Sequence, residues 1–102
     1  MQTHPLTVVT VIAEPVLEHR LTSELRALGA TGFTVVEGHG EGSQGRHAGE
    51  IPGENVRIET IVTDAVADRI VTRFAEAYFD DFAMVVYTTR AHVVRGAKYV
   101  GT

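Results

Sequence analysis

The sequence predicts one α+β domain with the element order β-α-β-β-α-β, and three observations predict this fold class. The chain has 102 residues, a length typical of one domain rather than two. Two segments carry apolar residues at helical spacing, and four others are rich in β-branched residues. A glycine-rich stretch, residues 38–54, separates the second predicted strand from the third. We therefore treat residues 1–102 as a single domain with one long internal loop.

The first half of the chain predicts a strand, a helix and a second strand. Residues 6–13 have apolar side chains at positions of both parities, which favours a central strand. From Val16 the pattern changes to an amphipathic helix, and its apolar residues are Leu17, Leu21, Leu25 and Leu28. Gly29 follows the last of them and is expected to end the helix in a left-handed conformation. Residues 33–37 predict the second strand.

The second half repeats this order. Residues 55–63 predict a third strand, and Asp64 is expected to be the N-cap of a second helix. The apolar stripe of that helix consists of Val66, Ile70, Phe74 and Ala77–Tyr78. Residues 83–89 predict the fourth strand, which residues 91–95 either extend after a kink or follow as a short edge strand. This order is the ferredoxin-like arrangement, a four-stranded antiparallel sheet with both helices on one face. The other face is apolar, which predicts oligomerisation.

Composition excludes several classes of protein. The chain has no cysteine, which rules out disulfides and thiolate metal sites. Its net charge of −4 argues against nucleic-acid binding. No apolar run approaches the roughly 20 residues of a membrane span, and residues 1–5 do not resemble a signal peptide. A cytoplasmic location is expected.

The loop 38–54 contains six of the ten glycines and only one large aliphatic side chain, Ile51. With little apolar surface to offset the entropy of ordering, it is expected to be flexible in the free protein. Glycine amides, the Ser43 hydroxyl and the Arg46 guanidinium together favour an anion-binding or phosphate-binding loop. A solvated connector without a ligand is equally consistent with this composition.

Three segments resemble the PII signal-transduction superfamily. Residues 29–37, Gly-Ala-Thr-Gly-Phe-Thr-Val-Val-Glu, resemble its helix-to-strand connection. Residues 38–43, Gly-His-Gly-Glu-Gly-Ser, resemble the base of its T-loop, and residues 55–59 resemble the strand that follows the loop. This resemblance implies a homotrimer that binds adenine nucleotides between subunits, has no catalytic activity, and regulates a partner through the T-loop, here about residues 38–54.

The departures from the usual PII pattern indicate the branch associated with bicarbonate transport and carboxysomes. Residues 77–83 lack the glycines and lysine of the phosphate loop, and residues 38–54 contain no tyrosine. AMP, ADP or cyclic AMP is therefore expected as ligand rather than ATP with 2-oxoglutarate, with ATP and bicarbonate as further candidates. The implied partner is a bicarbonate or other solute transporter, which would bring the protein to the membrane, or a carboxysome component.

The resemblance assigns nucleotide-binding roles to particular residues. Thr34 is expected at the adenine edge, and Tyr87 is expected to line the cleft. Arg46, Arg57 and Arg95 are expected to supply positive charge. The base of the loop is assigned to Gly40, Glu41, Gly42, Ser43 and Gln44.

Two alternatives stay open. His39, Glu41 and His47 could form the metal site of a trimer similar to the divalent-cation-tolerance family, although their spacing matches no known ligand signature. A small hydrolase of the same fold would need a catalytic set, and no nucleophile-base pattern is visible. Arg57 could equally pair with a neighbouring strand instead of binding a ligand. We therefore predict no catalytic residue, and the leading prediction includes no metal ligand.

Overall fold

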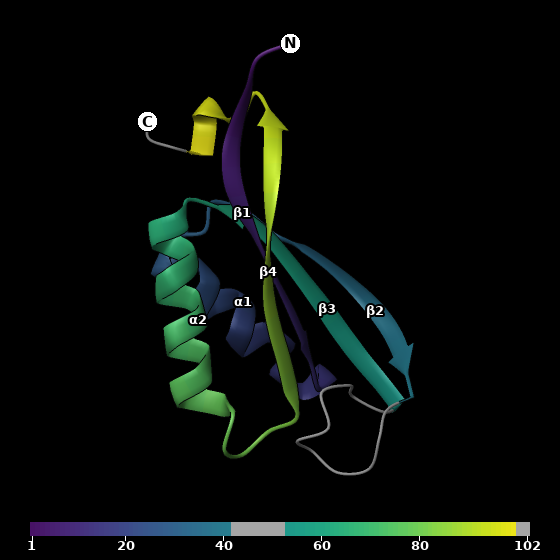
Figure 1. Ribbon diagram of the computed structural model, residues 1–102. Coiled ribbons are helices and arrows are strands. Elements are labelled where there is room, and N and C mark those ends of the chain that lie inside the picture. Colours follow the sequence, from purple (N-terminus) through teal and green to yellow (C-terminus); the bar gives the residue numbers. More distant parts are fainter. Residues whose placement is uncertain (42–52, 100–102) are drawn as a thin grey trace.

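The computed structural model describes residues 1–41 and 53–99, and it confirms the predicted fold class (Figure 1). Four strands form one antiparallel sheet in the order β2-β3-β1-β4. The strands are β1 (Thr3–Ala13), β2 (Thr34–Gly40), β3 (Gly53–Val62) and β4 (Met84–Val94). The α-helices are α1 (Glu18–Leu28) and α2 (Asp64–Tyr78), and two 3-10 turns are η1 (Pro15–Leu17) and η2 (Gly96–Tyr99).

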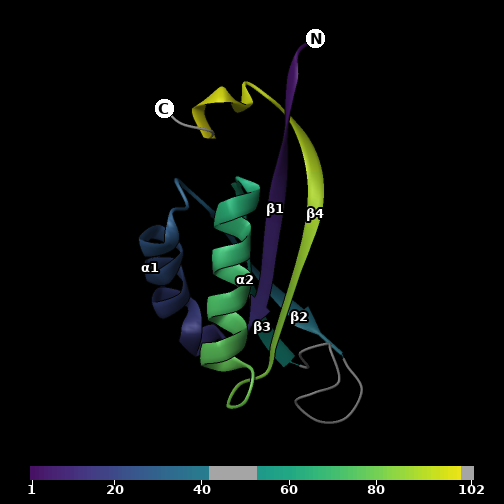
Figure 2. The ribbon, with the colours of Figure 1, turned by 60° about the vertical axis from the view of Figure 1, so that its left-hand side comes forward.

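Both α-helices lie on the same face of the sheet, as Figures 1 and 2 show from two directions. The core fills the space between the helices and this face, because alternate residues of β1 and β3 pack against the apolar stripes of α1 and α2. Its buried members include Val9, Val11, Ile58, Leu21, Leu25, Ile70, Phe74 and Tyr78. Neither α-helix of the described residues has the length and hydropathy that a membrane crossing requires.

The ends of the helices correct two details of the prediction. The turn at Pro15–Leu17 is 3-10, so α1 begins at Glu18 rather than Val16. Gly29 ends α1 with φ of 116°, as predicted. The expected N-cap of α2, Asp64, is its first residue instead, and the hydroxyl of Thr63 accepts the hydrogen bond of the Val66 amide. Threonine and aspartate are both good capping residues, and the extended conformation of Thr63 places it at the cap.

The loop between β2 and β3 is shorter than predicted. Residues 38–40 continue β2 and residues 53–54 begin β3, so Gly40 pairs with Gly53 at the end of the hairpin. Backbone hydrogen bonds need no side chains, and the ladder therefore runs through the glycines. At Gly38 a Cβ atom would lie 2.7 Å from Oδ1 of Asn55, so a larger residue there would require the Asn55 side chain to move. Residues 42–52 lie outside the described part of the chain.

Strand β4 is continuous from Met84 to Val94, so residues 91–94 extend it rather than form a separate edge strand. All eleven residues pair with β1, from Met84 opposite Ala13 to Val94 opposite Thr3. The strand ends at Arg95, which has a positive φ of 64°. The turn places the buried Gly96 against His4, where a Cβ atom would lie 2.7 Å from the histidine Cβ. Consequently η2 lies beside the start of β1 (Figure 1).

An ion pair between Asp64 and Arg90 connects the start of α2 to strand β4. Arg90 donates two hydrogen bonds to the Asp64 carboxylate, at 2.9 and 3.1 Å. The hydroxyl of Thr7 donates a third, at 2.6 Å. The Arg90 hydrogen bonds, followed by that of Thr7, hold the pKa of the Asp64 carboxyl below its ordinary value of 3.8.

The variant Asp64→Asn should therefore have a lower thermal midpoint than the wild type at neutral pH. A lowered pKa stabilises the fold above the unfolded-state pKa, and this contribution is lost as pH falls through the folded-state value. The difference between the two midpoints should thus shrink below about pH 4. Thermal melts between pH 2.5 and 7 measure it, with Asp68→Asn as the control on the same helix. A difference that does not change with pH would contradict the role of the ion pair.

Candidate functional site

A cleft of about 330 Å³ lies where the α1–β2 connection meets β3 and the C-terminal turn. Its volume falls in the range of small-molecule sites. One wall is the backbone that enters β2, a second is the last part of β3, and the third is η2. The lining residues are Thr31, Gly32, Phe33, Thr34, Glu59, Thr60, Ile61, Lys98 and Tyr99.

The first wall is held by contacts from three elements. Arg69 of α2 donates a hydrogen bond to the carbonyl oxygen of Leu28, at 3.3 Å. The guanidinium of Arg26 lies 4.8 Å from the centre of the Phe33 ring, a cation–π contact. The buried hydroxyl of Thr60 donates to the carbonyl oxygen of Gly32, at 2.6 Å. The backbone at residues 31–34 is therefore held in place before any ligand arrives.

The chemistry of the cleft suits a molecule with an aromatic ring, hydroxyls and a negative charge. Phe33 and Tyr99 provide aromatic surface, and the backbone of residues 31–33 provides donors and acceptors that belong to no helix or strand. Glu59 supplies a carboxylate, the usual acceptor for ribose hydroxyls. Lys98 supplies an ammonium group for an anion, and its Nζ lies 5.1 Å from the centre of the Tyr99 ring.

Of the six predicted site residues that the structure describes, Thr34 alone is among the residues that line this cleft. Tyr87 lines a different cleft, between α2 and β4, and Arg95 forms the turn before η2. Arg57 is exposed on β3, and neither ion pair of the described residues includes it or Glu59. Gly40 and Glu41 lie at the far end of the β2–β3 hairpin. The remaining four, Gly42, Ser43, Gln44 and Arg46, lie outside the described residues.

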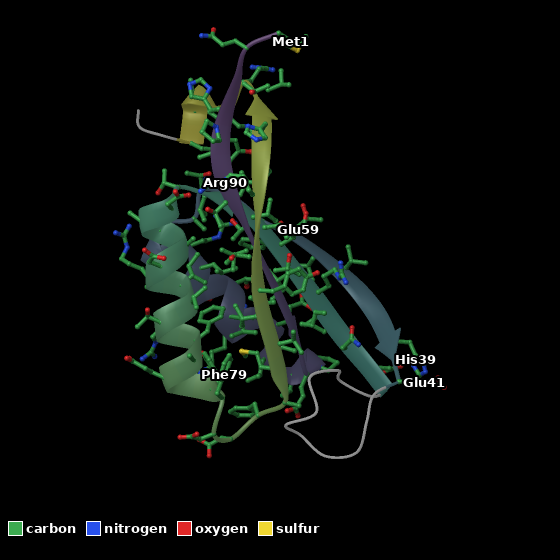
Figure 3. The ribbon with its side chains drawn as sticks, viewed as in Figure 1. Met1, His39, Glu41, Glu59, Phe79 and Arg90 are labelled. Carbon is green, nitrogen blue, oxygen red and sulfur yellow. The ribbon has the colours of Figure 1, made fainter. Side chains whose placement is uncertain are left out.

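Two of the predicted residues, Thr34 and Glu41, are far apart within one chain. Thr34 pairs with Glu59 at the start of β2, whereas Glu41 follows the last residue of that strand. A strand rises by about 3.3 Å per residue, so Thr34 and Glu41 are separated by roughly 20 Å. Figure 3 shows the same arrangement, with Glu59 near the middle of the sheet and His39 and Glu41 at the hairpin end. A single nucleotide does not span both positions on one chain.

The register of the sheet shows which predicted residues share a face. Thr34 lies opposite Glu59, which lies opposite Thr10, which lies opposite Tyr87. This row crosses all four strands on the face that the helices leave open, because the neighbouring residues Val9 and Val11 belong to the core. In the adjacent row Arg57 occupies the same face. Thr34, Arg57 and Tyr87 therefore share a face without sharing a cleft.

The metal hypothesis is not tested by this geometry. No group of three histidine, aspartate or glutamate side chains suited to a metal occurs among residues 1–41 and 53–99. His39 and Glu41 lie near each other at the hairpin end (Figure 3), and His47 is outside the described residues. The three-residue set therefore stays a prediction.

Sequence reasoning did not assign ligand roles to Phe33, Glu59, Lys98 or Tyr99. Lys98 and Tyr99 follow the last strand and carry no periodic signal, and only the turn at Arg95 brings them to the cleft. Glu59 alternates with buried residues of β3 and has the pattern of an ordinary exposed strand residue. The one available signal was residues 31–34, a short polar and glycine-containing segment between a helix cap and a strand.

Comparisons with known proteins agree with this fold. Residues 6–98 match the family model of the nitrogen regulatory protein P-II. A protein from Thermus thermophilus described as PII-like is 43% identical in sequence, and the alignment covers 97% of this chain and 99% of that one with a TM-score of 0.83.

Two further solved structures show the fold at lower identity. CPII from Thiomonas intermedia K12, bound to ADP and bicarbonate, is 24% identical, with a TM-score of 0.81 and coverage of 96% and 97%. The Bacillus subtilis GlnK–ATP complex is 22% identical, with a TM-score of 0.59 and coverage of 83% and 82%. The match over residues 6–98, together with the Thermus similarity, shows that the chain belongs to the nitrogen regulatory P-II protein family.

Proposed function

We propose that this protein is a non-enzymatic, PII-like regulator that binds an adenine nucleotide in the cleft lined by Thr31–Thr34, Glu59 and Lys98–Tyr99. The observation that carries the proposal is the composition of this cleft. It combines a preformed backbone edge for a base, aromatic surface, a carboxylate for ribose and an ammonium group for phosphate. ADP, AMP or cyclic AMP fits best, because Lys98 is the only cation among the described residues that line it.

The functional unit that we propose is a homotrimer with the nucleotide between subunits. Thr34 and the loop-base residues Gly40 and Glu41 lie too far apart to hold one nucleotide within a single chain. A second copy that brings its hairpin end to this cleft would unite them. In the complete site, we propose that the second copy also contributes the loop residues Gly42, Ser43, Gln44 and Arg46. Arg57, Tyr87 and Arg95 would lie along the boundary between the two copies.

The open face of the sheet supports assembly. Val36 and Tyr87 are 51% and 39% exposed on this face, and Ile12 and Val85 occupy the row next to that of Tyr87. Exposed apolar side chains on an open sheet face are often covered by a partner. Trimerisation through this face would bury it and leave the helices outside.

The bound ligands of CPII extend the proposal to inorganic carbon. That protein shares the fold and has been solved with ADP, AMP and bicarbonate. We propose that bicarbonate modulates nucleotide binding here as well, and that residues 38–54 transmit the bound state to a partner. A solute transporter at the membrane or a carboxysome component is the proposed partner. By linkage, partner and nucleotide affinities would change each other by the same factor.

Calorimetric titration of the purified protein with AMP, ADP, ATP and cyclic AMP, each with and without bicarbonate, tests the proposal. We expect micromolar binding at about one site per chain, which corresponds to roughly −8 kcal/mol. No hydrolysis of the bound nucleotide should occur on prolonged incubation. Mass measurement in solution should give three chains per particle.

The alternatives give different results in the same experiment. The absence of binding heat with all four nucleotides would overturn the proposed nucleotide-binding function. Tight binding of zinc or copper that is lost in His39→Ala would then favour the metal-binding trimer. Steady release of phosphate would instead indicate a hydrolase.

A further inference from the structure

The hydroxyl of Thr60 is a buried polar group whose hydrogen bond reaches the wall of the cleft. The residue is 2% exposed near the end of β3, and it pairs with the core residue Val9. Its hydroxyl donates to the carbonyl oxygen of Gly32 at 2.6 Å, in a segment that belongs to no helix or strand. A valine side chain at this core position would have nearly the same shape and would lack this bond.

The α1–β2 connection is fixed at both ends by other contacts. At its start, the Gly29 and Ala30 amides donate to carbonyl oxygens of α1, at 3.2 and 3.0 Å. At its end, Thr34 joins the ladder opposite Glu59. Between them, the Thr60 hydroxyl supplies the single side-chain hydrogen bond found to the backbone of residues 31–33 in the described part of the chain. It therefore determines the orientation of the middle of the wall.

The planarity of the peptide group gives this bond a directional consequence. The carbonyl of Gly32 and the N–H of Phe33 belong to one trans peptide and point in opposite directions. Because the carbonyl points to Thr60, the N–H points away from it. A flipped peptide would exchange a donor for an acceptor on that side, so the Thr60 hydroxyl determines which atoms of a base the wall can recognise.

We propose that Thr60 is a positioning residue that holds the Gly32–Phe33 peptide with its N–H toward an acceptor nitrogen of the bound adenine. This inference rests on the proposed function, since it concerns the same cleft. Thr60 also lines the cleft, but the role proposed for it is indirect. It acts through the orientation of the peptide and through the rigidity that the bond gives to the wall before binding.

The test compares ADP affinity in three variants by calorimetry. Thr60→Val, which is isosteric and lacks the hydroxyl, should weaken ADP binding about tenfold, the loss typical of one hydrogen bond. Thr60→Ser should restore the affinity to within about threefold. Thr7→Val is the matched control, because Thr7 also donates one hydroxyl hydrogen bond of 2.6 Å but does not line the cleft. It should leave ADP affinity within about twofold of the wild type.

A second measurement uses only the wild-type protein, and it tests the Phe33 N–H contact on which the proposal depends even if Thr60→Val does not fold. Saturating ADP should shift the Phe33 amide resonance and slow its hydrogen exchange about tenfold or more. Unchanged exchange at Phe33, or wild-type ADP affinity in Thr60→Val, would overturn the positioning role and leave the proposed function standing. Failure of the wild type to bind any adenine nucleotide would instead overturn the proposed function.

Discussion

Replacing Gly32 by leucine is expected to abolish nucleotide binding while the protein stays folded. Gly32 lines the cleft, and a Cβ atom added there would have no atom within 4 Å. Its backbone also lies outside the positive φ region that favours glycine. The larger side chain would therefore be tolerated by the fold and would extend into the space that the ligand needs. We expect at least a hundredfold weaker ADP binding, which corresponds to about 3 kcal/mol.

Calorimetry with ADP measures this loss, and thermal melts and solution mass establish that fold and assembly persist. Ala27→Leu is the matched control, because it adds the same side chain on the exposed surface of α1. Gly32→Ala should give an intermediate affinity. Wild-type affinity in a folded Gly32→Leu variant would place the nucleotide elsewhere and would contradict the assignment of the cleft.

Replacing Phe74 by alanine is expected to lower the free energy of unfolding by about 3–5 kcal/mol. The side chain is 0% exposed in the middle of α2. It packs edge-on against Tyr78, with ring centres 5.6 Å apart and an interplanar angle of 87°. The substitution removes this aromatic pair and leaves a cavity between the helices and the sheet. Since domains of this size have only about 5–15 kcal/mol of stability, the variant should be marginal at 37 °C.

Chemical denaturation at one protein concentration measures the effect of this substitution. Phe79→Ala is a suitable control, because the same residue type at the end of α2 is 39% exposed. It should cost less than about 1 kcal/mol, as surface substitutions commonly do. Equal losses in the two variants would mean that α2 does not pack on the sheet as described.

Local chemistry explains which features could be predicted from the sequence. The apolar residues of both helices were predicted correctly, because their spacing fits one face of an α-helix. The left-handed conformation of Gly29 was also predicted, because glycine adopts it readily at a helix end. Thr63 and Asp64 are adjacent capping residues, so the pattern did not distinguish them. Gly38 and Gly40 do not contribute to an alternating apolar and polar pattern, so the sequence did not predict them as strand residues. They belong to β2 because they pair with β3.

The candidate site was harder to predict because its parts come from three separated segments. Thr34 was proposed from the resemblance to the PII superfamily, and it lines the cleft in the structure. Lys98 and Tyr99 reach the cleft only through the positive φ of Arg95 and the close approach of Gly96 to His4. Arginine does not favour that conformation, so no local signal indicates the turn. In the sequence Thr60 occupies a core position of β3, and only its hydrogen bond to Gly32 in the structure indicates a role for its hydroxyl.

The position of β1 in the sheet has a consequence for synthesis of the chain. Strand β1 is central, and it leaves the ribosome before both of its neighbours in the sheet, β3 and β4. Thr3 obtains its partner Val94 only after the residues between them have been translated. Such non-local pairing is slow, and until β4 emerges at least one edge of β1 is open to other chains. Nascent chains on one message are therefore most prone to aggregation before β4 emerges, and chaperone contact should be concentrated on residues of β1.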